Sequence, residues 1–256
     1  MLKQPNLLIA IDLGNSAASY GVYSGAKLLS SGYAGNDSIP KLVNTIYKKG
    51  VLDHNNKVII SSVVPYLTLK LTESVGRYIP KNRVYVIGKT FKLKIPMKYR
   101  QKDLGSDRLV NIYGALRRYK LPVLIADFGT AITFDCISKK GIFEGGLIVP
   151  GIGLSADALA EKTALLPKLT EIKSVRGLVG RNTKEAMYSG LLNGFGALSD
   201  GLIERFRKRY GKLTVVATGG FAVKIAPYVK HFDYIDPLHT IHSLALIYRN
   251  EIEKKK

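Results

Sequence analysis

The sequence has a single cysteine, Cys136, so the chain cannot form an internal disulfide. Cys136 lies in the apolar, strand-like run AITFDCI, where a free thiol behaves as a small buried hydrophobic side chain. We therefore interpret it as a structural residue without a redox role. The sequence also has no run of 18 or more apolar residues, which excludes a helix that spans a bilayer.

A secretory leader is also missing from the beginning of the sequence. The first ten residues include Lys3, Gln4 and Asn6 and do not form the apolar core that such a leader needs. We therefore expect a cytoplasmic protein without a membrane partner.

Acidic residues are scarce: 39 Lys and Arg stand against 19 Asp and Glu, which gives a net charge of +20. This excess favours anionic ligands such as nucleotides, acidic metabolites or nucleic acid. The basic residues are scattered, however, and neither an RNP-like aromatic pattern nor zinc-finger spacing accompanies them. We interpret the charge as a solvated basic surface and expect no nucleic-acid partner.

Several well-known ligand motifs are missing. There is no GxxxxGK[ST], so a P-loop is excluded. The GxGxxA pattern at 151–156 follows Pro150 in the middle of the chain rather than the first strand of a βαβ unit, so we do not expect a dinucleotide site there. His239 and His242 lack further ligands at metal-binding spacing, and we interpret them as part of the polar face of a helix.

The hydrophobic patterns and turn residues that are present predict a mixed α/β chain. The expected strands are 7–12, 18–23, 27–33, 58–64, 83–87, three more around the segment 123–150, and 213–218. The expected helices are 39–48, 65–78, 106 to about 120, 155–166, 183–210, 222–229 and 237–253.

An Asp-x-Gly turn occurs twice, at Asp12 and at Asp127, 115 residues apart (127 minus 12). Each turn ends an apolar strand and precedes two further strands. This self-similarity predicts an internal duplication, with domains at residues 1–120 and 121–256. A carboxylate at the end of a strand faces the crevice where α/β proteins bind ligands, and the glycine lets backbone N–H groups approach a phosphate. Two such turns predict a site for a polyphosphate and its metal.

Five segments resemble, in order, the signatures of type III pantothenate kinase: DLGNS at 12–16, GSDR at 105–108, DFGTAIT at 127–133, GGLIVPG at 145–151 and GRNTKEAMYSG at 180–190. TGG at 218–220 extends the resemblance to nearly the whole chain. That family belongs to the actin-like, sugar-kinase and Hsp70 ATPase superfold. The resemblance therefore implies two duplicated actin-like (ribonuclease H-like) domains, with mixed sheets flanked by helices and a cleft between the domains.

The resemblance also implies an activity: ATP-dependent phosphorylation of the primary hydroxyl of pantothenate to 4'-phosphopantothenate, the first step of coenzyme A biosynthesis. Asp107 matches the family's catalytic proton acceptor. Asp12 matches a residue that reaches Mg²⁺ through water, and Asp127 matches the ligand of a monovalent cation, K⁺ or NH₄⁺. The implied ATP contacts are Asp12, Leu13, Gly14, Asn15, Ser16, Ala17, Ala18, Ser19 and Thr130. The implied pantothenate contacts are Tyr99, Gly105, Ser106, Asp107, Arg108 and Thr183.

Some of these residues also fit purely local roles. Ser106 and Asp107 are typical of an N-cap and a first-turn acid of a helix. Asn182 and Glu185 are typical of a capping box, which would account for the polar residues around Thr183 without a ligand. Tyr99 stands six residues before Gly105, whereas the family has a tyrosine in Y-x-x-P seven residues before this glycine, so its match is partial.

The expected helix 183–210 carries an apolar stripe that is typical of core packing: Met187, Leu191, Phe195, Leu198, Leu202 and Phe206. Gly190 and Gly194 would let a second helix approach closely. Members of the family are homodimers, so the resemblance implies a homodimer that uses this region. Two other functions stay open, namely another small-molecule kinase of the same superfold and a non-catalytic, transcription-linked accessory factor. The intact acids argue against the latter.

Overall fold

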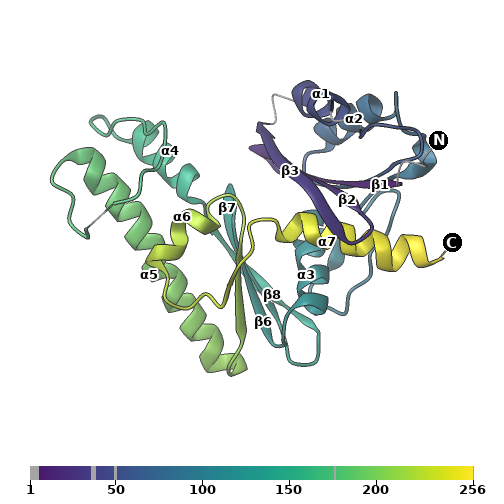
Figure 1. Cartoon of the computed structure of the whole chain (residues 1–256). Coiled ribbons are helices and arrows are strands. Elements are labelled where there is room, and N and C mark those ends of the chain that lie inside the picture. The colour runs from purple at the N-terminus through teal and green to yellow at the C-terminus, as the bar shows by residue number, and fades with distance from the viewer. Residues whose placement is uncertain (1–5, 36–38, 49–50, 176, 256) are drawn as a thin grey trace. The chain divides into compact units, whose positions relative to one another are not determined.

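A computed structural model describes residues 6–35, 39–48, 51–175 and 177–255. Residues 1–5, on which the expected absence of a leader partly rests, lie outside these ranges. The chain forms two compact units, each built on a five-stranded sheet (Figure 1). Unit 1 comprises residues 1–95, 100–117 and 239–256, and unit 2 comprises 96–99 and 118–238.

The sheet of unit 1 has the strand order β3-β2-β1-β4-β5. β1, β2 and β3 form an antiparallel meander, whereas β4 and β5 run parallel to β1. A left-handed glycine, Gly25, makes the tight turn between β2 and β3. The strands are β1 (Leu7–Leu13), β2 (Ala17–Ser24), β3 (Lys27–Gly35), β4 (Lys57–Ser62) and β5 (Val84–Val86).

Helices cover both faces of this sheet, which is why the central strand β1 is an almost continuous apolar run. Ile9, Ile11 and Leu13 face the core that β1 shares with α1 (Ile39–Lys48) and α2 (Pro65–Val75). On the other face, α7 (His239–Ile247) packs so closely that a Cβ on Gly21 would lie 2.5 Å from the side chain of Ile241. Figure 1 shows α1 and α2 on one side of β1–β3 and α7 on the other.

The sheet of unit 2 repeats the same plan, with the order β8-β7-β6-β9-β10. Again three strands form an antiparallel meander and two run parallel to the first of them. Asp12 and Asp127 each occupy the second-last position of the central strand. The predicted duplication is therefore confirmed. The strands are β6 (Val123–Phe128), β7 (Ala131–Ile137), β8 (Phe143–Pro150), β9 (Thr214–Thr218) and β10 (Tyr234–Ile235).

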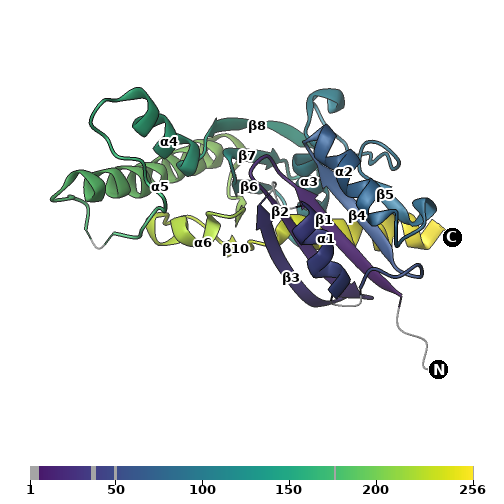
Figure 2. The same cartoon turned by 90° about the horizontal axis from the view of Figure 1, so that it is seen from above.

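The core of unit 2 lies between one face of its sheet and the helices α4 (Ile152–Lys162), α5 (Thr183–Tyr210) and α6 (Ala222–Ile225), which Figure 2 shows beside one another. Cys136 is a buried member of this core, and burial raises the pKa of its thiol to about 12. The interpretation of Cys136 as a structural residue is confirmed.

The bounds of α5 agree with the predicted helix 183–210 at both ends. The side chain of Asn182 accepts the backbone N–H of Glu185 at 3.0 Å, while the Glu185 carboxylate accepts the N–H of Arg181 at 2.9 Å. At the other end, Gly211 adopts a positive φ of 77° and donates its N–H to the carbonyl of Arg207. Capping residues at both ends explain why these bounds were readable from sequence.

Other helix predictions were less accurate. The helix expected at 155–166 begins earlier, at Ile152, and ends at Lys162. The stretch expected at 222–229 is α6 followed by a 3₁₀ turn at Ala226–Tyr228, because Pro227 has no N–H to continue an α-helix. The final stretch is α7, then a π-helical segment at Tyr248–Ile252 and a 3₁₀ turn at Glu253–Lys255. The described helices include none with the length and apolar character to cross a membrane.

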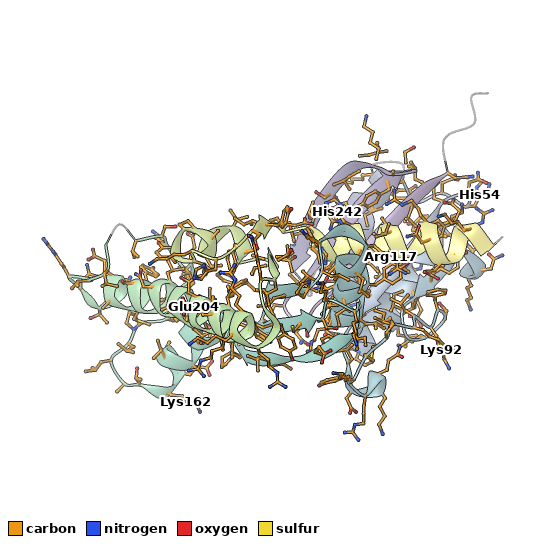
Figure 3. All side chains as sticks on the ribbon, turned by 90° about the horizontal axis from the view of Figure 1, so that it is seen from below. His54, Lys92, Arg117, Lys162, Glu204 and His242 are labelled. Carbon is orange, nitrogen blue, oxygen red and sulfur yellow. The ribbon has the colours of Figure 1, made fainter. Side chains whose placement is uncertain are left out.

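Two features of unit 1 differ from expectation. Residues 239–256 belong with the first sheet, although the sequence placed the whole of 121–256 in the second domain. His239 is fully buried and its Nε2 lies 2.9 Å from the carbonyl oxygen of Asn111 on α3 (Ser106–Arg118), so the predicted polar helix face was wrong for this residue. His242, labelled in Figure 3, has its Nδ1 2.8 Å from the Tyr23 hydroxyl.

Candidate active site

Asp12 stands near the carboxyl end of β1, between hydroxyl-bearing residues of both neighbouring strands. Its register partners are Ser19 on β2 and Ser61 on β4. Residues in register on adjacent strands project from the same face of a sheet, so the carboxylate of Asp12 lies among these hydroxyls. This cluster of oxygen atoms offers donors and acceptors to a ligand at the strand end.

The turn after β1 exposes backbone to a ligand. Gly14 donates its N–H to the carbonyl of Ala17 at 3.1 Å, which closes a tight loop. Asn15, Ser16 and Ala17 in this loop are exposed. Leu13 and Ala18, which the resemblance implied as ATP contacts, are fully buried in the core of unit 1. These two residues could contact ATP only through their backbone.

Ser106 fixes the beginning of α3 against the end of β4. Its Oγ donates to the carbonyl of Ser62 at 2.8 Å, accepts the N–H of Ser62 at 3.0 Å and lies 3.3 Å from the Oγ of Ser61. The interpretation of Ser106 as an N-cap was therefore wrong, because its hydroxyl binds the neighbouring strand rather than its own helix. Ser106 thus contacts Ser61, which is the register partner of Asp12, and Asp107 is the next residue after Ser106.

Asp107 lies in the first turn of α3 and is partly buried. Burial raises the pKa of its carboxyl above the ordinary value, while the N–H of Arg108, 2.8 Å from Oδ1, and the charge of Arg108 act in the opposite direction. The carboxylate lies over Gly105, where a Cβ would come within 2.5 Å of Oδ1. Gly105 is thus needed for this position of the acid, and a carboxyl with a raised pKa is suited to accept a proton.

Arg108 follows Asp107 and is 8% exposed. A guanidinium stays charged at all physiological pH values, and burying it is costly unless it has partners. Its charge acts on Asp107, as the direction of the pKa effect shows. A buried arginine beside a partly buried acid is a residue held in place rather than a mobile surface side chain.

In unit 2, Asp127 ends the central strand in the same manner. Its register partners are Thr133 on β7 and Thr218 on β9. Gly219 follows Thr218 with a φ of 90°, and a Cβ at this position would clash with the Oδ1 of Asp127 and the backbone of Phe128. Only glycine is compatible with both the backbone angle and the nearby carboxylate.

Thr218 is a site residue that the sequence analysis did not single out as a ligand. It is 1% exposed, and its Oγ1 has no hydrogen-bond partner among the residues that the structure describes. An unsatisfied buried hydroxyl is costly, so it marks a place where a bound ion, water or ligand oxygen fits. The signal was available in the TGG motif at a strand end. The Ser61 and Ser62 pair at the end of β4 was missed as well.

Thr130 lies in the exposed turn between β6 and β7. Its carbonyl accepts the N–H of Gly151 at 3.1 Å, and a Cβ on Gly151 would clash with that carbonyl. The GGLIVPG segment therefore ends at a glycine that holds the Asp127–Thr130 turn. The structure thus places Asp127, Thr130 and Thr218 at one edge of the second sheet.

The other two predicted substrate residues of unit 2 come from different elements. Thr183 is the first residue of α5 and is exposed, next to the capping residue Asn182. Tyr99 lies in the short segment 96–99, and its ring is tilted by 49° against that of Phe143, with ring centroids 5.7 Å apart.

Two duplicated α/β units, each with an acid and a glycine turn at the end of its central strand, define a protein of the actin-like fold class. The chain belongs to the type III pantothenate kinase family, whose model matches residues 8–205. The family catalyses pantothenate phosphorylation in coenzyme A biosynthesis.

Curated relatives are similar along almost the whole chain. The type III pantothenate kinase of Moorella thermoacetica is 36% identical over 252 residues, covering 94% of this chain and 98% of the relative. That of Dehalococcoides mccartyi is 37% identical over 254 residues, covering 94% and 97%.

Solved structures show the same fold at lower identity. A Baf family transcriptional activator from Campylobacter jejuni has a TM-score of 0.62 at 21% identity, covering 96% of this chain and 99% of that one. MreB 5 of Spiroplasma citri bound to AMPPNP has a TM-score of 0.54 at 14% identity, covering 98% of both chains. At these identities the likeness concerns the fold alone.

Proposed function

We propose that this chain transfers the γ-phosphoryl group of ATP to the primary hydroxyl of pantothenate, with Asp107 as the residue that orients the hydroxyl and accepts its proton. The observation that carries this assignment is the attachment of α3 to β4 through Ser106. This attachment holds Asp107 next to the strand end where Asp12 stands. Phosphoryl transfer depends mainly on positioning and charge stabilisation, so a fixed acid is the chemistry required.

The proposed step is an in-line displacement. The hydroxyl oxygen of pantothenate forms a bond to the γ-phosphorus, the bond from that phosphorus to the β–γ bridging oxygen breaks, and ADP leaves. The hydroxyl proton passes to a carboxylate oxygen of Asp107. Because burial raises the pKa of Asp107, this carboxylate binds a proton more readily than an exposed one.

Asp12 fits a Mg²⁺ ion held through water. Mg²⁺ prefers oxygen ligands, keeps several of its waters and is usually bound by one or two carboxylates together with substrate phosphates. Among the described residues no group of three or more His, Cys, Asp and Glu could hold a metal, which is compatible with a site completed by ATP and water. A bound ion would neutralise phosphate charge, and the exposed loop residues 15–17 would offer backbone N–H groups.

Asp127 and Thr218 fit a monovalent cation, K⁺ or NH₄⁺. The carboxylate and the hydroxyl come from register partners on adjacent strands. The hydroxyl oxygen of Thr218 is buried and has no other partner among the described residues. Oxygen donors of this kind suit a hard cation, and the proposed ATP contact Thr130 belongs to the same turn.

Arg108 suits the pantothenate carboxylate, because a planar guanidinium can donate two parallel hydrogen bonds to it. Tyr99 and Thr183 complete the proposed substrate contacts. Thr183 is exposed at the beginning of α5, where its hydroxyl and the helix N-terminus can both donate to an oxygen of the substrate. We place the protein in the cytoplasm, where ATP is the available phosphoryl donor.

We also propose a homodimer formed through α5. Gly190 and Gly194 have open space where a Cβ would be, and they line a hollow of ≈ 530 Å³ with Leu178 and Val179. Leu178 is 74% and Val179 82% exposed. Exposed large apolar side chains beside a glycine-bearing helix surface are typical of a covered interface, so a second copy of the chain is the proposed occupant.

A coupled ADP-release assay tests the proposed reaction. The native chain is given ATP, Mg²⁺ and pantothenate, with K⁺, with NH₄⁺ or with neither, and Asp107→Asn is measured in parallel. We expect pantothenate-dependent ADP release that requires a monovalent cation and falls by about 10²- to 10⁴-fold in Asp107→Asn. Absence of pantothenate-dependent turnover with either cation, together with salt-sensitive binding to DNA, would favour the accessory-factor alternative instead.

A further inference from the structure

Residues 96–99 belong to a different unit from the residues on either side of them. They belong to unit 2, whereas residues up to 95 and from 100 to 117 belong to unit 1. The segment lies between β5 and α3, and it leads directly to the Gly105–Arg108 motif. We call the stretch 93–101 the tongue and residues 96–99 its tip.

The tip is held by the backbone of one residue at the beginning of β8. Lys98 donates its N–H to the carbonyl of Phe143 at 2.9 Å, and Phe143 donates its own N–H to the carbonyl of Pro96 at 2.9 Å. Met97 and Phe143 form a parallel bridge. The tip thus extends the second sheet past its edge strand β8, and Phe143 is fully buried beneath it. Two backbone hydrogen bonds to a buried residue fix the position of the tip.

Side chains of the tip make two further contacts with β8. The Nζ of Lys98 lies 2.7 Å from the Oε2 of Glu144, and this hydrogen bond lowers the pKa of the Glu144 carboxyl, so the carboxylate is charged at neutral pH. The ring of Tyr99 contacts the ring of Phe143 at a tilt of 49°. Gly145 has a φ of 123°, and a Cβ built on it would lie 4.0 Å from the ring of Tyr99, which is an ordinary contact distance.

The base of the tongue is fixed within unit 1. Gln101 donates its side-chain N–H to the carbonyl of Leu93 at 2.5 Å, which closes the loop on itself. A 3₁₀ turn at Gln101–Asp103 and an ion pair of 2.7 Å between Arg100 and Asp103 then lead to Gly105. The tongue is therefore short and closed at its base, and the contacts of its tip with Phe143 and Glu144 hold the segment that carries Tyr99.

We propose that Lys98 and Glu144 are positioning residues for pantothenate binding: their ion pair, next to the backbone contacts with Phe143, fixes the ring of Tyr99 in its binding orientation. This rests on the proposed role of Tyr99 in the reaction. Lys98, the residue before Tyr99, adds its 2.7 Å ion pair with Glu144 to the two backbone hydrogen bonds that join the tip to Phe143.

Steady-state kinetics of Lys98→Met and Glu144→Gln test this role. Because an exposed ion pair contributes modestly, each variant is expected to raise KM for pantothenate by about two- to fivefold. KM for ATP and kcat stay within experimental error, because neither residue meets the reacting atoms. Lys98→Arg, which keeps the charge and the donor, retains the native KM. The double variant Lys98→Met/Glu144→Gln is no worse than either single variant, because both remove the same interaction.

A stronger variant and a matched control complete the kinetic test. Lys98→Pro removes the N–H donated to Phe143 as well as the charge, and we expect KM for pantothenate to rise by about tenfold or more. Lys92→Met removes a lysine of the same loop that is exposed at the outside of unit 1 (Figure 3), and it leaves KM unchanged. If Lys98→Met and Glu144→Gln behave like Lys92→Met, or raise both KM values equally, the positioning role is refuted.

Hydrogen exchange gives a readout that does not depend on turnover. In Glu144→Gln, amides in a peptide covering 93–101 are expected to exchange faster than in the native chain. Glu171→Gln, which removes an exposed acid paired with Lys224 at 3.7 Å, leaves them unchanged. Unchanged exchange in Glu144→Gln refutes the ion pair as a determinant of the tip. If the native chain does not phosphorylate pantothenate while the exchange result holds, the proposed function fails and the attachment of the tip stands.

Discussion

The Oγ of Ser106 lies 3.0 Å from the backbone nitrogen of Ser62, so that α3 begins against the last residue of β4. Replacing Ser106 by alanine removes this bond and the one to the Ser62 carbonyl. We expect unfolding to become easier by about 1–3 kcal/mol, because buried groups lose their partner. We also expect kcat to fall by about tenfold or more, since Asp107 loses its anchor.

Ser74→Ala removes an exposed hydroxyl bonded to its own helix and serves as the control in thermal unfolding and kinetics. Equal behaviour of the two variants would contradict the anchoring role.

Asp107 is predicted to make the protein less stable at neutral pH than it would be with a neutral side chain. Folding raises the pKa of this carboxyl above 3.8, so the folded state binds the proton more tightly than the unfolded state. The contribution of Asp107 to stability therefore becomes less favourable as pH rises from about 3.8 through the folded-state pKa. Asp107→Asn should raise Tm at pH 7 while abolishing most of kcat, and this gain should disappear at pH 3. A lower Tm at pH 7 would show that the contacts with Arg108 outweigh burial.

The same raised pKa sets the pH dependence of catalysis. The ionised carboxylate is the form that accepts a proton, so kcat/KM should fall on the acidic side as Asp107 becomes protonated. The midpoint of this fall should lie above the ordinary pKa of an aspartate. Measuring kcat/KM for pantothenate from pH 4 to pH 8 tests this expectation. An acidic limb at or below 3.8 would assign the limb to a different group.

Gly219→Ala should be strongly destabilising. The position has a positive φ, and a Cβ there meets Oδ1 of Asp127 and the backbone of Phe128. We expect a loss of about 1–3 kcal/mol in the free energy of unfolding from backbone strain alone. The variant should also need a higher concentration of K⁺ or NH₄⁺ for half-maximal activity. Gly220→Ala is the matched control, because a Cβ on Gly220, the next residue in the chain, would lie in open space. Thermal unfolding of both variants and cation titration of Gly219→Ala separate the two effects. A Gly219→Ala variant as stable as Gly220→Ala would show that the turn adapts.

Gly194→Leu tests the dimer. The substitution fills open space on the exposed surface of α5 and should not disturb the core of unit 2. We expect the native chain to elute as a dimer and the variant as a monomer in light-scattering chromatography, with Thr183-dependent substrate binding weakened. Gly220→Leu adds the same side chain elsewhere on unit 2 and should leave the oligomeric state unchanged. A native chain that is a monomer at micromolar concentration would contradict the proposed interface.

The strand ends of the fold were the most predictable part of the site. An apolar run followed by Asp-x-Gly occurs twice, and both acids stand at the second-last position of a central strand, as the duplication requires. The bounds of α5 were also predictable, because Asn182 is a local start signal for a helix and Gly211 is a local stop signal. These features depend on neighbours in the sequence, so the sequence is sufficient to predict them.

Other features depend on residues that are far apart in the chain. Ser106 looked like a helix cap, yet it binds Ser62, 44 residues away. His239 looked like a surface residue, yet the close packing of α7 on α3 buries it against Asn111. No local pattern distinguishes these outcomes, because a hydroxyl or an imidazole can bind its own helix, water or a distant strand with similar energy.

The sequence by itself determined the repeated α/β plan, the positions of Asp12 and Asp127 at their strand ends, and the membership of a kinase family, because periodicity, turn glycines and motif order are written in local residues. Only the tertiary structure decided that Ser61 stands in register with Asp12, that Thr218 stands in register with Asp127, and that residues 96–99 add to the edge of the second sheet. Strand register and edge pairing are set by the packing of whole sheets, which no single segment specifies.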